Sequence, residues 1–111
     1  MPAQFKLSKT SNDQYRFSLT AENNKKILSS ETYKSKDAAK GGIHSVQANA
    51  PLDARYESKT ASNGKFYFVL KAANHEIIGT SEMYDTEAGC KNGIEAVKRV
   101  APTAAIQDQT G

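Results

Sequence analysis

The chain has 111 residues, of which 15 are Lys or Arg and 12 are Asp or Glu, so its formal net charge is +3, too small to indicate a nucleic-acid partner by itself. Cys90 is its only cysteine, which excludes an intrachain disulfide, and the longest unbroken apolar run, Phe66 to Leu70, is far too short to cross a bilayer. With no apolar leader between Met1 and Lys9, we expect a soluble, unprocessed, cytoplasmic protein.

The first predicted element is a short strand from Phe5 to Lys9, and it has a counterpart at Tyr56 to Thr60. This correspondence extends without a gap, because residue i in 5–51 matches residue i+51 in 56–102, and 16 of the 47 positions are identical. Such a repeat indicates one structural unit used twice. We therefore expect residues 1–111 to form a single domain built from two repeats, about 3–52 and 54–108.

The second predicted strand follows a short turn, Ser11-Asn12-Asp13 in the first copy and Ser62-Asn63-Gly64 in the second. Apolar residues alternate with polar ones, as expected of a strand with one face on a core; they are Tyr15, Phe17, Leu19 and Ala21, repeated as Phe66, Phe68, Leu70 and Ala72. A three-residue loop pairs Phe5 with Leu19 and keeps the apolar side chains on one face, whereas a two-residue loop would separate them. Such loops commonly end in the left-handed region, which suits Gly64 better than Asp13.

A second turn, at Asn23-Asn24 and again at Asn74-His75, leads into a third short strand that contains Ile27 or Ile78. The sequence leaves the length of this loop open.

A helix closes each copy. Ser35 and Thr86 are the predicted N-caps, and Pro51 and Pro102 follow the predicted helix ends. Each helix carries one apolar stripe, formed by Ala39, Ile43, Val46 and Ala50 in the first copy and by Cys90, Ile94, Val97 and Ala101 in the second. Gly42 and Gly93 reduce helix propensity by about 1 kcal/mol each relative to alanine, so their presence in both copies predicts close helix-sheet packing.

The repeated pattern resembles the YegP-like family of small bacterial proteins. The resemblance rests on Phe17-x-Leu19-x-Ala21, Asn23, Ile27, Ser30-Glu31-x-Tyr33 and Gly42-Ile43-x-x-Val46, and on the equivalent residues from Phe68 to Val97. It implies an α+β fold in which two tandem pseudo-symmetric β3-α(-β) repeats form one antiparallel sheet with two helices on one face. It also implies that Leu52 to Arg55 and Ala104 to Gln107 form crossing strands and that the chain is a monomer. The family implies no catalytic activity, cofactor or substrate.

The polar residues that both copies retain are Ser30-Glu31-x-Tyr33 and Ser81-Glu82-x-Tyr84. Paired glutamates can act as acid and base, but two similar environments would not separate their pKa values. We interpret each tyrosine as an anchor at the helix entry, and we predict no catalytic, cofactor-binding or metal-binding residues. His44 and His75 align with Glu95 and Asn24, so they are expected at the surface, whereas Cys90 aligns with Ala39 and is expected in the core.

The sheet face opposite the helices is the remaining candidate surface. It is predicted to display Arg16, Ser18 and Thr20 from the first copy and Tyr67, Val69 and Lys71 from the second, with Lys25 and Lys26 nearby. Residues 1–51 hold 8 basic and 4 acidic side chains, against 7 and 8 in residues 52–111. The leading hypothesis is a non-enzymatic protein-interaction module that uses this face. The alternative is weak binding of single-stranded nucleic acid, and an enzyme that uses the two glutamates and two tyrosines is a third hypothesis.

Overall fold

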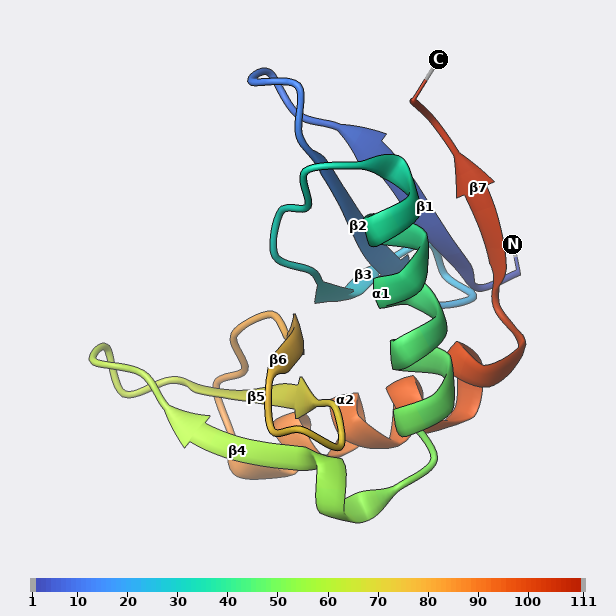
Figure 1. Cartoon of the computed structure of the whole chain (residues 1–111). Coiled ribbons are helices and arrows are strands. Elements are labelled where there is room, and N and C mark those ends of the chain that lie inside the picture. Colours follow the sequence, from blue (N-terminus) through green and yellow to red (C-terminus); the bar gives the residue numbers. More distant parts are fainter. Residues whose placement is uncertain (1, 111) are drawn as a thin grey trace.

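The computed structural model describes residues 2–110 and contains one seven-stranded sheet with two helices (Figure 1). The first copy comprises β1 (Gln4–Lys9), β2 (Tyr15–Thr20), β3 (Lys26–Ser29) and α1 (Lys36–Asn49). The second copy comprises β4 (Tyr56–Thr60), β5 (Phe66–Lys71), β6 (Ile77–Thr80) and α2 (Glu87–Val100). Short 3₁₀ helices, η1 (Asp53–Arg55) and η2 (Ala101–Thr103), precede β4 and the last strand, β7 (Ala105–Asp108). The strand order in the sheet is β4-β5-β6-β3-β2-β1-β7.

The first hairpin of each copy has the predicted register. Phe5 pairs with Leu19 and Leu7 with Phe17, while Tyr56 pairs with Leu70 and Ser58 with Phe68. The loop residue in the left-handed region is Asp13 in the first copy, with φ 64°, and Gly64 in the second, with φ 81°.

The second hairpin also has a three-residue loop, which settles the length that the sequence left open. The Ala21 amide donates to the Lys25 carbonyl at 2.8 Å, and the Ala72 amide donates to the Glu76 carbonyl at 2.9 Å. The last loop residue is again left-handed, because Asn24 has φ 64° and His75 has φ 70°. His75 therefore has a turn position that its counterpart Asn24 fills equally well.

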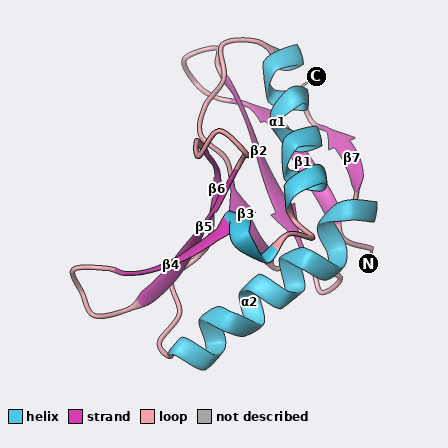
Figure 2. Ribbon diagram, turned by 60° about the horizontal axis from the view of Figure 1, so that its bottom comes forward, coloured by secondary structure: helices cyan, strands magenta, loops and turns pink. Residues whose placement is uncertain are grey.

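Both helices begin at the predicted caps. The Ser35 hydroxyl accepts from the Ala38 amide at 3.1 Å, and the Thr86 hydroxyl accepts from the Gly89 amide at 3.0 Å. Both helices lie on one side of the sheet, as Figure 2 shows. Helix α1 contacts β1 and β2 but also reaches β5 and β6, and α2 contacts β5 and also β3. The two copies therefore share one hydrophobic core.

Glycine permits the close approach of each helix to its sheet. A Cβ atom on Gly42 would lie 2.4 Å from the Tyr33 hydroxyl oxygen, and one on Gly93 would lie 2.3 Å from that of Tyr84. Each tyrosine ring stacks on a core phenylalanine, with ring centroids 6.1 Å apart for Tyr33 and Phe17. The sequence prediction of close packing is confirmed, and the group that the helix approaches is the retained tyrosine.

The two copies meet where β3 and β6 run side by side. The two strands pair through Ser29 and Thr80, which are equivalent residues of the repeat, so a pseudo-twofold axis passes between them. Next to this pair the copies differ, because Leu28 aligns with Gly79. A Cβ atom on Gly79 would lie 2.6 Å from the Leu28 Cδ2 atom, so the leucine side chain fills the space that the glycine leaves.

The C-terminal crossing strand is confirmed, but the equivalent strand in the first copy is not. Strand β7 pairs with β1 in parallel, Gln4 with Ala105 through Leu7 with Asp108, so the sheet is mixed rather than purely antiparallel. Leu52 to Arg55, predicted as a strand, instead form a turn and η1. The physical reason is connection length: these residues belong to the six-residue connection, 50–55, between the end of α1 and β4, and they cannot also run along a sheet edge.

Replacement of Asp13 by glycine is expected to stabilise the protein by about 0.5 kcal/mol, because relief of left-handed backbone strain outweighs the added flexibility of the unfolded chain. Its ion pair with Lys9, at 3.4 Å, is exposed and contributes little. The melting temperature should rise by about 2–4 °C. Gly64→Ala in the matching loop should lower it, and an unchanged or lower value for Asp13→Gly would contradict the strain argument.

Gly93→Ala is expected to destabilise the protein by about 1–3 kcal/mol, because the added methyl group meets the Tyr84 ring. Gly41→Ala is the matched control, since this helical glycine is exposed and a Cβ atom added there would meet nothing within 4 Å outside its own helix turn. That change should stabilise by about 1 kcal/mol through helix propensity alone. Urea denaturation measures both values, and equal effects of the two substitutions would show that α2 is not held against the sheet.

Candidate functional site

The candidate surface lies on the sheet face opposite the helices, where one row of paired residues crosses both copies. The row runs from β1 to β4 through Lys6, Ser18, Ser29, Thr80, Val69 and Glu57. Strands β2 and β5 are separated by β3 and β6, so their side chains lie about 14 Å apart at ordinary strand spacing. The predicted residues of the first and second copies therefore form two neighbouring areas rather than one cluster.

Two of the predicted surface residues are buried, which corrects the expectation that they are displayed. Val69 is 3% exposed, because Thr80 and Glu57 flank it in the row and Glu57 forms ion pairs with Lys71 and Lys59 beside it. Thr20 is 4% exposed, and its hydroxyl donates to the Gln4 carbonyl at 3.3 Å. Val69 is shielded and Tyr67 is half-buried, but Ile77, which pairs with Lys71 on this face, is 41% exposed.

In the first copy, the structure brings three predicted residues together around a shallow hollow. Arg16, Ser18 and Lys26 line it, and the space measures about 450 Å³. The rest of the lining consists of Ser8, Lys9, Thr10 and Ser11 from strand β1 and its hairpin loop, and of Phe17 from β2. Arg16 and Lys26 are exposed, and Ser18 is half-buried. The hollow therefore combines three cationic side chains with four hydroxyl groups and no carboxylate.

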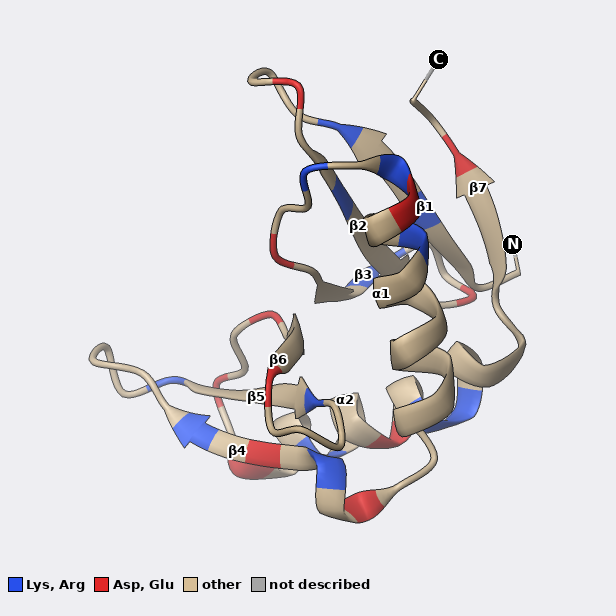
Figure 3. Cartoon of the chain, in the orientation of Figure 1, with Lys and Arg blue, Asp and Glu red and all other residues tan. Residues whose placement is uncertain are grey.

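The charges differ between the two areas. Figure 3 shows Lys and Arg along β1 and β2, whereas the start of α1 and strand β4 carry charges of both signs. In the second copy, Glu57 forms ion pairs with both Lys71 and Lys59, which lower its pKa, so these three side chains together carry one positive charge. Within residues 2–110, Arg16 and Lys26 have no ion-pair partner. Lys25 is exposed in the second hairpin loop, beside the hollow rather than in its lining.

The repeated Ser-Glu-x-Tyr residues serve the fold. The Ser30 hydroxyl accepts from the Phe17 amide at 2.9 Å and donates to the Glu31 carbonyl at 2.7 Å. Ser81 makes the same two bonds, to the Phe68 amide and the Glu82 carbonyl. Each hydroxyl therefore bonds a backbone amide of the second strand at the point where the chain leaves the third strand and regular strand pairing ends.

The tyrosines and glutamates of this motif do not form an acid–base site. Burial, with a smaller contribution from the adjacent glutamate, raises the pKa of Tyr33, and burial likewise raises the pKa of Tyr84. Both rings pack on phenylalanines of their own copy, whereas Glu31 and Glu82 are exposed. His44 is exposed on α1, and the described chain contains no group of three His, Cys, Asp or Glu side chains that could hold a metal ion.

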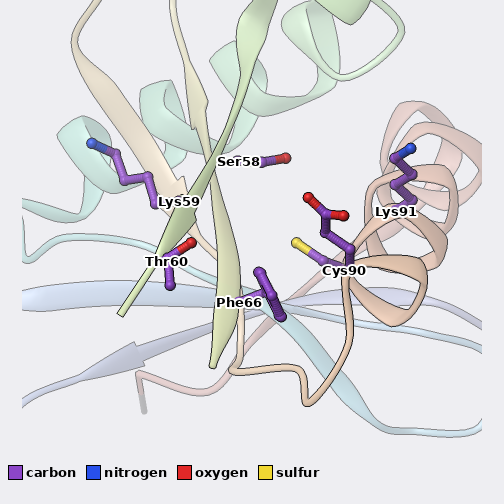
Figure 4. Close-up of a pocket in the computed structure, with 7 residues that line it drawn as sticks. Ser58, Lys59, Thr60, Phe66, Cys90 and Lys91 are labelled. Atoms are coloured by element: carbon purple, nitrogen blue, oxygen red, sulfur yellow. The ribbon is translucent and has the colours of Figure 1, made fainter. Parts of the chain in front are cut away.

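Cys90 is buried, as the repeat predicts, and is 2% exposed. Burial raises the pKa of its thiol, although a hydrogen bond with Ser58 acts in the opposite direction. Figure 4 shows Cys90 on α2 facing Ser58 on β4 across a small cavity of about 110 Å³. The sequence does not predict this cavity.

Comparison with known proteins agrees with the duplicated fold. The family model described as "Domain of unknown function (DUF1508)" matches twice, at residues 10–57 and 61–108, which reproduces the offset of 51 residues. The UPF0339 protein YegP of Escherichia coli K12 is 53% identical over 99% of this chain and its own full length. The chain belongs to the YegP-like UPF0339 family. A UPF0339 protein of Shewanella oneidensis is 51% identical, again over 99% of this chain and the relative's full length.

Solved structures of the family have the same fold. The solution NMR structure of yegP from E. coli, a protein of unknown function, superposes with a TM-score of 0.94 at 53% identity, covering 100% of this chain and 96% of that chain. The UPF0339 protein from Shewanella oneidensis gives 0.92 at 51% identity, with 99% and 93% covered. In the part of the chain that the structure describes, neither helix is long and apolar enough to span a membrane.

The hollow escapes sequence analysis because three separate segments line it. Alternation along β2 places Arg16 and Ser18 on the open face, and the adjacent strand brings Lys26 beside them. The twist of the first hairpin brings Lys9, Thr10 and Ser11 to the hollow, and an alternating sequence pattern does not indicate this twist. The sequence feature that could have indicated the hollow is the excess of basic residues in the first copy.

Ellman's reagent is expected to label native Cys90 far more slowly than the denatured chain, because the thiol is buried and its raised pKa reduces the thiolate fraction at pH 8. Labelling should accelerate as the pH rises toward that pKa. The variant Cys90→Ala/Ala88→Cys provides an exposed thiol on the same helix and should react rapidly. Equally rapid labelling of wild-type Cys90 would mean that the thiol is accessible.

Proposed function

We propose that this protein is a non-enzymatic binding module whose open sheet face binds an acidic segment of another protein. The observation that carries the proposal is the hollow lined by Arg16, Ser18 and Lys26 together with the first hairpin. Arginine forms paired hydrogen bonds with carboxylates, and the surrounding hydroxyls supply further donors. A neutral or basic segment would find no complementary charge there.

The proposal places the protein in the cytoplasm as a monomer. A reduced, buried single cysteine is compatible with a reducing compartment. The two copies already complete one sheet and one shared core, so no second chain is required for folding. Exposed cations that contact a partner would act mainly through association rate and specificity, and we expect modest affinity with strong dependence on salt.

Binding of single-stranded nucleic acid is the second candidate, and Tyr67 is the observation that favours it. Its half-buried ring lies on the same sheet face and pairs across strands with Lys59. An aromatic ring beside a cation can stack on a base, which contributes about 1–3 kcal/mol per base. Lys59 and Lys71 share the single carboxylate of Glu57, so one positive charge remains uncompensated near the ring.

The double variant Arg16→Ala/Lys26→Ala is expected to weaken binding of an oligoglutamate peptide by roughly tenfold at low salt, because two exposed charge contacts are lost. Lys34→Ala is the control, since Lys34 is exposed in the loop before α1 and does not line the hollow. Titration followed by amide NMR shifts measures affinity and location together. The proposal predicts that shifts concentrate on residues 8–18 and 26.

The same titration with an oligothymidine separates the two candidates. Binding of the oligothymidine that Tyr67→Ala abolishes, with no binding of oligoglutamate, would establish the nucleic-acid alternative instead. Oligoglutamate binding that the double variant leaves unchanged would show that the hollow is not the site.

A further inference from the structure

Strand β4 is an open edge of the sheet at the position that corresponds to β1. In the first copy, β7 covers β1, whereas no described strand lies beyond β4, as Figure 1 shows. Equivalent side chains of β1 and β4 differ in exposure accordingly. Phe5 and Leu7 are fully buried, but Tyr56 is only partly buried and Ser58 is exposed.

The edge of β4 presents unpaired backbone groups in the geometry that β1 uses. The amide and carbonyl of Phe68 both bond to Ser81, at 2.9 Å each, and therefore point away from β4. Because Ser58 stands opposite Phe68 in an antiparallel pair, its own amide and carbonyl point outward. The equivalent carbonyl in β1, that of Leu7, accepts from the Gln109 amide at 2.7 Å.

A groove runs between this edge and α2. One part, about 270 Å³, is lined by Tyr56, Ile94 and Lys98 together with Asp53, Ser58, Lys91 and Glu95. The smaller cavity beside it is lined by Ser58, Lys59, Thr60, Phe66, Glu87, Cys90 and Lys91, so Glu87 is its only carboxylate beside two lysines (Figure 4). In the first copy, β7 lies along the corresponding edge: Ile106 pairs with Phe5 and is 36% exposed, and Asp108 bonds to Lys36 at 2.9 Å.

The charge at the end of the groove is different in the two copies. Asp108 meets Lys36, and hydrogen bonds from the Thr110 hydroxyl and amide together with Lys36 hold its pKa well below the usual range. The counterpart of Lys36 is Glu87, while Lys91 matches Lys40. An aspartate at the equivalent position would therefore lose its cationic partner and face a carboxylate, whereas a lysine or arginine would gain one.

We infer that β4 binds an extended segment of another protein as an added parallel strand, with an apolar residue beside Tyr56 and Ile94 and a basic residue two positions later beside Glu87. Addition of a strand to an open sheet edge is a recurring mode of peptide recognition. The chain's own segment 105–108 is already paired with β1, and that of a second copy would bring Asp108 against Glu87. The surface and the charge of this partner differ from those of the acidic segment proposed above, so each proposal can fail alone.

The probe is an eight-residue peptide with the sequence of residues 103–110 in which lysine replaces Asp108. The unmodified aspartate peptide is its control, and a third peptide, N-methylated at the residue equivalent to Gln109, cannot donate to the Ser58 carbonyl. In wild-type protein, the lysine peptide is expected to bind about fivefold more tightly than the aspartate peptide. Amide NMR shifts should concentrate on residues 56–60 and the first turn of α2, and N-methylation should abolish binding.

Glu87→Lys recreates the first-copy arrangement and should reverse the preference between the two peptides. Lys36 occupies the equivalent helix position, so this variant should fold, and the comparison of peptides on wild-type protein needs no variant at all. Glu76→Lys makes the same charge change in a hairpin loop and should leave the preference as in wild type.

Three results would overturn the inference. One is the absence of saturable shifts at residues 56–60 with any peptide. Another is equal affinity for the lysine and aspartate peptides in both wild type and Glu87→Lys. The third is a concentration-dependent dimer, detected by light scattering, in which hydrogen exchange at the β4 amides is slowed, because a second copy would then be the occupant.

Discussion

The exchange of helix contacts across the β3–β6 junction is the interaction on which this structure depends. Each copy has only three strands and one helix, and a three-stranded sheet with a single helix buries little apolar surface. Because α1 reaches β5 and β6 while α2 reaches β3, neither copy completes its core alone. The narrow strand contact through Ser29 and Thr80 therefore joins two halves that are held mainly by their helices.

Covalent linkage of the copies explains why a nearly symmetric sequence gives an asymmetric sheet. After α2 the chain is free to continue along β1 as β7, but after α1 it must enter β4 within the six residues 50–55. The first family match ends at residue 57, inside β4, and the second ends at 108, the last residue of β7. Equivalent stretches of sequence thus have different structures because of where the next element lies. The same constraint leaves the β4 edge and its groove uncovered.

The elements that sequence reasoning predicts correctly are those fixed by local patterns. Alternation and loop length determine the first hairpin, hydroxyl caps mark the helix starts, and Gly42 indicates close packing of the helix on the sheet. The crossing strand proposed for Leu52 to Arg55 failed because connection geometry overrides a family resemblance. The prediction that Val69 is exposed was wrong for another reason. An alternating sequence pattern identifies the face of a strand, but the neighbouring Glu57 and Thr80 decide whether a side chain on that face is covered. The hollow around Arg16 needs three segments together, which no single pattern contains.

The contact of Leu28 with Gly79 shows that the two copies are no longer interchangeable. Equivalent positions next to a twofold axis face each other, so a chain made of two first copies would bring leucine against leucine in space for one side chain. A chain made of two second copies would place glycine on both sides and leave that space empty. Each half therefore complements the other at this position, and a symmetric pair of either half would be overpacked or underpacked there.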